Sequence, residues 1–138
     1  MSLSAVRSLF IACSLACAAP AHAGELASGE TTDGITRIKL LPPGPDNPRN
    51  SEGDFIELKD GRVLFVYTHF TGGAGDHASA HLAGRFSSDE GRSWTAEDVV
   101  ILPNEAKQNV MSVSLLRLHD GRIALFYLRK NSLSDCRP

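Results

Sequence analysis

The side chains that could transfer protons gather around one short loop of the sequence. Asp76 and His77 end the glycine-rich stretch "TGGAGDH", and His69 comes just before it. Carboxylates and imidazoles are among the groups that proteins use as general acids and bases. An aspartate in a glycine-rich loop can equally well cap a turn, so the loop alone leaves both roles open for Asp76. The spacing of His, Asp and Glu along the chain indicates no metal site.

The composition and the first residues favour an exported protein. The chain has 138 residues, 42% of them hydrophobic, and a formal net charge of -2, so it lacks the broad basic surface of a nucleic-acid-binding protein. Near the start, Arg7 precedes the apolar run "LFIACSLACAA", which is too short to span a bilayer, and "AHA" provides a small-x-small cleavage pattern. We therefore predict a signal peptide over residues 1–23, cleavage after Ala23, and a secreted or periplasmic protein with no membrane segment once the signal is removed. Two of the three cysteines leave with the signal, so Cys136 has no internal disulfide partner.

The rest of the sequence predicts short strands and turns. Residues 24–48 are rich in Gly, Pro, Thr and Asp and are expected to be irregular, apart from one short strand candidate, "ITRIKLL". Farther on, runs of strand length alternate with turn signals, and none has a sustained helical period. The expected strands cover residues 54–58, 63–69, 78–86, 98–102 and 113–118.

An internal repeat organises these strands. The segments "LKDGRVLFVY" (residues 58–67) and "LHDGRIALFY" (residues 118–127) align without gaps at an offset of 60 residues. Each has the pattern of a hairpin, in which an Asp-Gly turn joins an alternating strand to an apolar one. A repeat of this length with four short strands is typical of a β-propeller blade, so the chain supplies about two blades.

The stretch "SSDEGRSWT" (residues 87–95) fits one of the predicted turns. Asp89 can accept backbone N–H groups of its own turn, Gly91 permits a positive φ, and the single tryptophan, Trp94, can pack under the sheet edge. In an antiparallel sheet, this turn and the two Asp-Gly turns share one end, and the "TGGAGDH" loop lies at the other end, roughly 20–30 Å away. Side chains at one end therefore take no part in chemistry at the other.

The motif Ser-x-Asp-x-Gly-x-Ser-Trp resembles the Asp-box of sialidases, six-bladed β-propellers that remove terminal sialic acid. The residues that match it are Ser87, Asp89, Gly91, Ser93 and Trp94. The resemblance extends over residues 49–127. It implies an all-β, six-bladed β-propeller of sialidase type, of which residues 49–138 form part.

The resemblance also implies a site for an acidic sugar. Arg49 stands where sialidases place an arginine before the first strand, although Asn50 and Ser51 follow in place of the family's Ile-Pro. Asp76 precedes Arg85 by nine residues, as the acid/base aspartate does in the family. Guanidinium groups bind carboxylates by paired hydrogen bonds, and a protonated aspartate can give a leaving oxygen its proton. Arg85 is expected only to support the Asp-box turn.

Other residues at the same end of the sheet are candidates for contact with sialylated or other acidic glycans. These are His69, His77, Lys107, Gln108, Asn109 and Asn131. Tyr67 and Tyr127 occupy equivalent repeat positions inside strands and are expected to pack in the core. No cofactor is expected.

Three functions remain open at this point. They are a secreted exo-α-sialidase-type glycoside hydrolase, a non-catalytic propeller that binds glycans or protein, and a propeller enzyme that acts on another acidic sugar. Arg49 can also be a solvated loop charge. Because sialidases use a tyrosine nucleophile and two blades do not close a ring, we expect the chain to be part of a longer propeller protein and to show no hydrolysis by itself.

Overall fold

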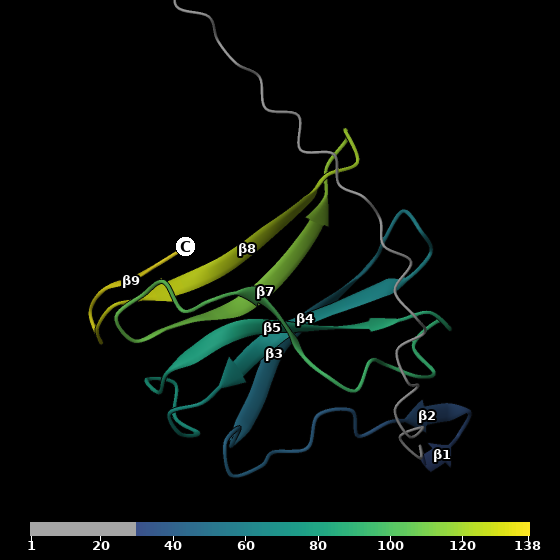
Figure 1. Ribbon diagram of the computed structural model, residues 1–138, viewed down its shortest axis with the longest axis horizontal. Coiled ribbons are helices and arrows are strands. Elements are labelled where there is room, and N and C mark those ends of the chain that lie inside the picture. The colour runs from purple at the N-terminus through teal and green to yellow at the C-terminus, as the bar shows by residue number, and fades with distance from the viewer. Residues whose placement is uncertain (1–29) are drawn as a thin grey trace, which may run out of the picture.

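All regular structure in the computed structural model, which describes residues 30–138, is β-strand (Figure 1). A two-stranded hairpin, β1 (Glu30–Thr32) and β2 (Ile35–Arg37), precedes a seven-stranded open sheet. The strands of this sheet are β3 (Arg49–Glu57), β4 (Val63–Phe70), β5 (Ala80–Ser87), β6 (Val99–Leu102), β7 (Asn109–Arg117), β8 (Ile123–Lys130) and β9 (Cys136–Arg137). The predicted all-β class is confirmed for these residues. The predicted signal peptide lies outside them.

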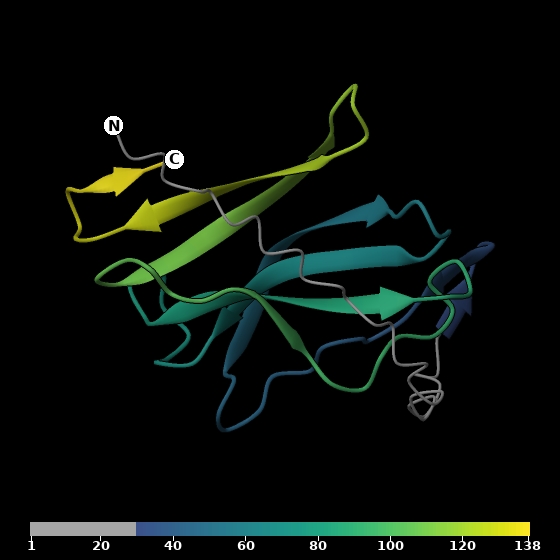
Figure 2. The ribbon, with the colours of Figure 1, turned by 45° about the horizontal axis from the view of Figure 1, so that its top comes forward.

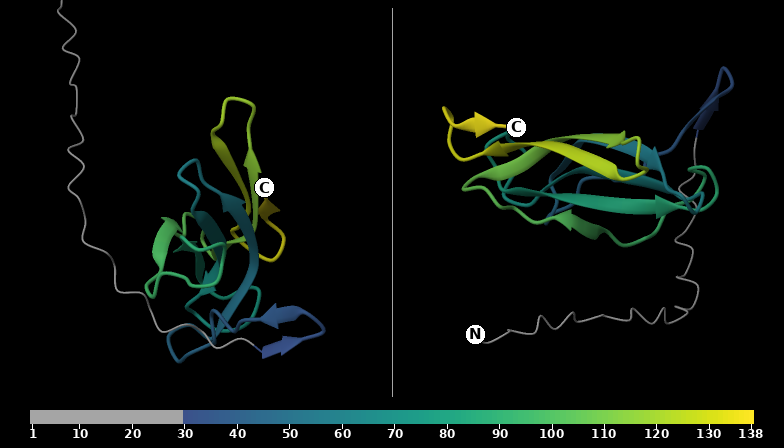
Figure 3. Two further views of the ribbon diagram at one scale, coloured as in Figure 1. Left: turned by 90° about the vertical axis from the view of Figure 1, so that its right-hand side faces the viewer. Right: turned by 90° about the horizontal axis from the view of Figure 1, so that it is seen from above.

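The seven-stranded sheet has two parts that meet at one point. Strands β3, β4, β5 and β6 form an antiparallel unit in sequence order. Strand β7 joins β5 in parallel through the pair Ala80 and Asn109, and continues into β8 and β9 as antiparallel neighbours. The β7–β8 hairpin lies across one face of the four-stranded unit (Figure 2) and the views in Figure 3 agree. Within the part of the chain that the structure describes, no helix could span a membrane.

The sequence repeat corresponds to two hairpins with the same register. In the first hairpin (residues 49–70), Arg49 pairs with Phe70, and in the second hairpin (residues 109–130), Asn109 pairs with Lys130. Each has a bulge at the same position, between residues 51 and 54 and between residues 111 and 114. Their turns are alike too, because each DGR aspartate accepts hydrogen bonds from the backbone N–H and Nε of its own arginine.

The bulges explain why two strands begin earlier than predicted. Strand β3 starts at residue 49 rather than 54, and β7 at residue 109 rather than 113. Glu52 and Ser112, with φ of 49° and 63°, occupy the bulges, and regular pairing resumes on their N-terminal side. The polar residues at the start of β3 and β7, which the sequence predicts as loop, therefore belong to the strands.

The segment before β3 is also more ordered than expected. The strand candidate "ITRIKLL" is extended only over Ile35–Arg37, and it pairs with Glu30–Thr32, which was expected to be irregular. Asp33 and Gly34 join these strands with φ of 53° and 73°. Two consecutive positive φ angles are those of a type I′ turn, the favoured two-residue hairpin connection.

The core lies between the two hairpins. Val66, Leu82 and Val110 form a fully buried cluster. Tyr67 is also buried, as predicted, and burial raises the pKa of its phenol above the ordinary value. Tyr127 packs against the core with its ring, but its hydroxyl reaches the surface and donates to Glu105 at 2.8 Å, which raises its pKa. The expectation of a core role holds for Tyr67 and only in part for Tyr127.

Candidate functional site

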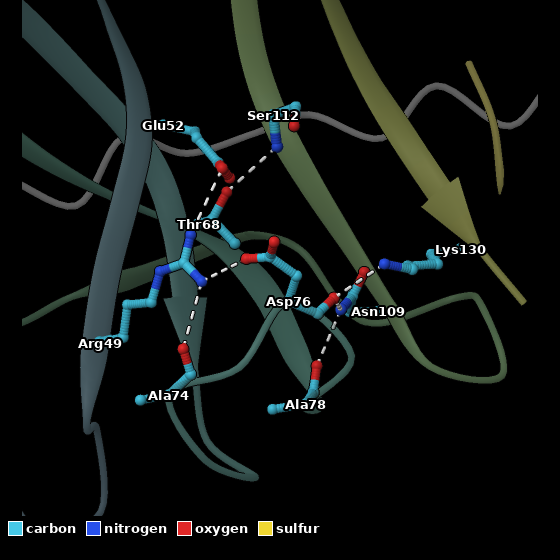
Figure 4. Close-up of polar contacts among 9 residues, drawn as sticks. All are labelled: Arg49, Glu52, Thr68, Ala74, Asp76, Ala78, Asn109, Ser112 and Lys130. Carbon is cyan, nitrogen blue, oxygen red and sulfur yellow. Dashed lines mark hydrogen bonds and ion pairs between the residues drawn. The ribbon is translucent and has the colours of Figure 1, made fainter. Parts of the chain in front are cut away.

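Arg49 and Asp76 form an ion pair at one end of the sheet (Figure 4). Arg49 is the first residue of β3 and is paired with Phe70, so it stands beside the loop that follows β4. Its Nη1 lies 2.5 Å from Oδ1 of Asp76 and also donates to the carbonyl oxygen of Ala74 at 3.2 Å. The guanidinium carbon lies 4.6 Å from the centroid of the Phe70 ring, a cation–π distance. The two residues that the sequence predicts as acid/base and carboxylate ligand therefore touch each other.

The loop that carries Asp76 is anchored by the second hairpin. The side-chain Nδ2 of Asn109 donates to the carbonyl oxygens of Asp76 at 3.0 Å and Ala78 at 2.8 Å. Nζ of Lys130 donates to the same Asp76 carbonyl at 3.2 Å. Asn109 and Lys130 are both buried. Because these anchors hold the backbone, the carboxylate of Asp76 stays available to other partners.

The loop also closes on itself, which fixes the position of Asp76. The backbone N–H groups of Thr71 and Gly72 both donate to the carbonyl oxygen of Ser79, and that of Ala78 donates to the carbonyl of Gly75. A short ordered loop on a rigid sheet is a common arrangement for binding residues. The backbone that carries the Asp76 carboxylate is therefore held in a defined conformation.

The electrostatics of the pair favour a charged Asp76 in the free protein. The hydrogen bond and the charge of Arg49 lower the pKa of Asp76, and Lys130 and His77 act in the same direction. The Asp76 side chain is 62% exposed and that of Arg49 is 27% exposed, so an incoming anion can reach both. Glu52 Oε1 lies 3.5 Å from Arg49 Nη2 and is a second negative partner. The guanidinium is therefore already neutralised, and an anionic ligand must compete for it.

The structure brings only some of the other candidates to this pair. His77 is exposed beside Asp76. His69 turns away, with Nδ1 3.0 Å from Asp98 and its ring stacked on His81 at 4.6 Å. Asn109 is the anchor described above, so in this conformation its amide faces the loop backbone, and a substrate contact by it stays a prediction. Lys107 and Gln108 precede β7 and Asn131 follows β8, and the Lys107 N–H donates to Asn131 Oδ1.

Lys130 and Glu52 are members of the site that the sequence analysis missed. Lys130 occupies the repeat position of Phe70, and a mostly apolar strand that ends in two basic residues is the signal that could have found it. Glu52 sits at the bulge, and nothing in the sequence marks that bulge except its later copy at Ser112. Both residues depend on a register that becomes visible only when the hairpins are paired.

The opposite end of the sheet carries the Ser87–Trp94 turn, whose polar groups bond to each other. Oδ1 and Oδ2 of Asp89 accept from the N–H and hydroxyl of Ser93 at 2.8 and 2.6 Å. Ser87 Oγ donates to Asp89 Oδ1 and accepts from the Gly91 N–H, both at 2.8 Å. These bonds, led by that from the Ser93 hydroxyl, lower the pKa of Asp89 to about 2. Gly91 has a φ of 88°, the conformation for which glycine is suited.

Trp94 completes this turn, and Arg85 pairs with an aspartate that follows it in the chain. The Trp94 Nε1 donates to the Gly91 carbonyl at 3.0 Å, and its ring lies 5.7 Å from Phe55 and 6.0 Å from Phe65. Arg85 Nε donates to Asp98 Oδ1 at 2.7 Å, where β6 is about to begin. The Trp94 contacts hold the turn. The ion pair of Arg85 is not confined to the turn, because Asp98 also lies 3.0 Å from Nδ1 of His69.

The described residues contain no group of three or more His, Cys, Asp or Glu side chains that could hold a metal ion. Cys136 is exposed with a free thiol. The sequence matches no protein-family model and no curated protein sequence. The interpretation of the site accordingly rests on its geometry.

Proposed function

We propose that the Arg49–Asp76 end of the sheet recognises an acidic sugar, with terminal sialic acid as the preferred substrate class, as part of a sialidase-like β-propeller exported from the cell. The observation that carries the proposal is the 2.5 Å contact between the Arg49 guanidinium and an exposed, loop-borne carboxylate. The sialidase-like Asp-box at the other end of the same strands supports it. In this proposal Arg49 binds the sugar carboxylate and Asp76 is the acid/base.

Competition between the sugar carboxylate and Asp76 for the Arg49 guanidinium explains how Asp76 becomes protonated in this proposal. In the free protein the guanidinium stabilises the charged aspartate and lowers its pKa. A sugar carboxylate that takes over the guanidinium removes that stabilisation and brings a second negative charge near Asp76. Both effects raise the pKa of Asp76, so it takes up a proton when the substrate binds. The protonated carboxyl can then donate to the leaving oxygen.

A binding function without catalysis is the second candidate, and one observation favours it. Arg49 contacts two carboxylates, Asp76 and Glu52, which is a pattern seen in structural ion pairs as well as in catalytic sites. If Asp76 only holds Arg49 in place, Asp76→Asn should free the guanidinium and strengthen binding of the sugar acid without removing any turnover. If Asp76 is the acid/base, the same variant should lower hydrolysis of a sialoside with a poor leaving group by roughly a hundredfold or more in a protein that has turnover.

Binding of N-acetylneuraminic acid and of its methyl ester to the chain tests the recognition step. The two ligands differ in the charge of one group, so their difference in affinity measures recognition of the carboxylate. We expect the acid to bind more tightly to the wild type and Arg49→Ala to abolish the difference, because a charge-assisted pair is lost. Isothermal titration calorimetry reports both affinities.

Arg122→Ala is the matched control for this experiment. Arg122 is also an arginine paired with an aspartate, Asp120, but it is 77% exposed and lies in the turn at the far end of the sheet. It should leave the preference for the acid unchanged. Equal affinity of the wild type for the acid and the ester would contradict the proposal, and so would a preference that survives Arg49→Ala.

A further inference from the structure

Two cations contact Asp76, and each binds a different part of it (Figure 4). Arg49, the first residue of β3, holds the carboxylate, with Nη1 2.5 Å from Oδ1. Lys130, the last residue of β8, holds the backbone, because its Nζ donates to the Asp76 carbonyl oxygen at 3.2 Å. Recognition of a sugar acid by Arg49 leaves the charge of Lys130 without a role.

The two cations differ in how easily a ligand reaches them. The Arg49 side chain is 27% exposed, and its aspartate partner is more exposed still. Lys130 is only 7% exposed, and its Nζ is bound to the backbone of the loop. An incoming anion can therefore displace the Asp76 carboxylate from Arg49 but cannot replace it at Lys130. Ligand binding removes one cation from Asp76 and leaves the other in place.

The ammonium group of Lys130 has no carboxylate partner of its own. Among residues 30–138, its Nζ contacts the Asp76 carbonyl and pairs with no Asp or Glu side chain. Lysines are rarely buried unless they are paired, because removing a charge from water is costly. Its charge does act on the Asp76 carboxyl, whose pKa is lowered mainly by Arg49 and in addition by Lys130. A buried charge aimed at a candidate acid/base points to function.

The sequence repeat shows that the fold does not require a lysine at this position. Its counterpart in the first hairpin is Phe70, which is fully buried. There the cation belongs to the other strand, and the Arg49 guanidinium lies over the Phe70 ring. In the second hairpin the position of Arg49 is taken by the neutral Asn109, and its strand partner Lys130 carries the charge. Each hairpin thus directs one cation toward the same aspartate.

We propose that Lys130 is a positioning residue, which holds a fixed positive charge against Asp76 while the sugar carboxylate occupies Arg49. It acts on Asp76 in two ways, through the hydrogen bond to the carbonyl oxygen and through its charge. This role rests on the proposed function, which supplies the exchange of partners at Arg49.

The charges around Asp76 show what the lysine does during that exchange. The charged groups that face the carboxylate or pair with its arginine are Arg49 and Glu52 from β3, His77 from the loop itself and Lys130 from β8. The Asn109 amide, from β7, is neutral. When an anion takes Arg49, Lys130 is the buried positive charge that remains, and it limits the rise in the pKa of Asp76. A carboxyl group that must give a proton and later take one back benefits from this limit.

The pKa of Asp76 in four proteins tests this role without any ligand. The proteins are the wild type, Arg49→Gln, Lys130→Gln and the double variant, and each glutamine removes a charge but keeps an N–H donor. The ¹³C signal of the Asp76 carboxyl group, followed from about pH 7 to about pH 2, gives the titration midpoint. Arg49→Gln imitates the displaced arginine. In that background, Lys130→Gln should move the midpoint to higher pH, because the charged carboxylate loses its remaining buried cation.

Two further variants separate the charge of Lys130 from its anchoring of the loop. Lys130→Arg keeps the charge, so in the Arg49→Gln background it should leave the midpoint unchanged. Asn109→Ser removes the bonds to the carbonyl oxygens of Asp76 and Ala78 without a change of charge, and it should also leave the midpoint unchanged. If Lys130→Gln fails to fold, Lys130→Met, which suits a buried position, repeats the test.

A midpoint that does not move when Lys130→Gln is added to Arg49→Gln would overturn the role of the lysine. An equal movement caused by Asn109→Ser would overturn it too, because anchoring alone would then explain the effect. Saturating N-acetylneuraminic acid should move the wild-type midpoint in the same direction as Arg49→Gln does. A sugar acid that does not bind would contradict the proposed function together with this role, whereas an unmoved midpoint in the double variant contradicts the role of Lys130 alone.

Discussion

The two ends of the sheet each carry an aspartate in a glycine-containing loop, and the two aspartates are used in opposite ways. Asp89 receives its hydrogen bonds from the serines and backbone of its own turn. Asp76 meets one cation from another strand, and its side chain is 62% exposed. An aspartate whose partners are all local is committed to the fold, whereas one held by a single exposed arginine can exchange that partner for a ligand.

The backbone shows the same difference. The hydrogen bonds that close the Ser87–Trp94 turn all lie among residues 86–95. The loop with Asp76 depends on Asn109 and Lys130, which follow it by more than thirty residues in sequence. The site is therefore assembled by the pairing of two hairpins, while the scaffold turn is encoded in one continuous motif.

Trp94→Ala should have the largest effect on stability among changes at the turn end. It removes an indole that is partly buried, its contacts with Phe55 and Phe65, and a hydrogen bond to Gly91. A buried tryptophan is worth about 3–5 kcal/mol, and for this half-covered one we expect about 2–3 kcal/mol. Urea unfolding followed by circular dichroism measures the loss.

Leu133→Ala provides the control for that comparison, since Leu133 is 72% exposed and its truncation should change the free energy of unfolding little. A Trp94→Ala variant as stable as Leu133→Ala would show that the turn end is not the scaffold.

The loss of folding stability at acidic pH should depend more on Asp89 than on Asp76. Both have a lowered pKa in the folded protein, to about 2 for Asp89. The unfolded chain therefore binds more protons between about pH 4 and pH 2, and the stability that the charged group provides is lost as the pH falls through this window. Asp89→Asn should flatten the loss of stability across it. Asp76→Asn should flatten it less, because solvent screens an exposed pair.

Urea midpoints at several pH values between 5 and 2 measure this difference. Equal slopes for the wild type and Asp89→Asn would contradict the structural role of the Asp89 carboxylate. A larger change in Asp76→Asn than in Asp89→Asn would reverse the assignment of the two ends.

The sequence predicts the scaffold end well because its information is local. The spacing of Ser87, Asp89 and Ser93 is enough to expect a turn closed by its own side chains, and Asp-Gly turns with flanking apolar alternation are enough to expect both hairpins. The strand starts are missed because bulges at Glu52 and Ser112 interrupt the alternation. A left-handed residue in a strand has no fixed sequence signature.

The site end is only half predictable, because its contacts join segments that are far apart in the sequence. Arg49 and Asp76 are candidates by residue type, by position and by a resemblance. That they touch depends on the pairing of Arg49 with Phe70 across the first hairpin. That Lys130 and Asn109 hold the loop depends on the parallel pairing of Ala80 with Asn109. The register between strands so far apart in sequence is set by packing, which no local pattern reports.

Nuclear magnetic resonance of the ¹⁵N-labelled chain during titration with N-acetylneuraminic acid tests the central claim most directly, because it locates the ligand without assuming a reaction. The account predicts amide shifts at Arg49, at residues 74–78 and at Asn109, with the Ser87 to Trp94 turn unchanged. Shifts centred on that turn, or no shifts at either end, would contradict the assignment of ligand chemistry to the Arg49–Asp76 end of the sheet.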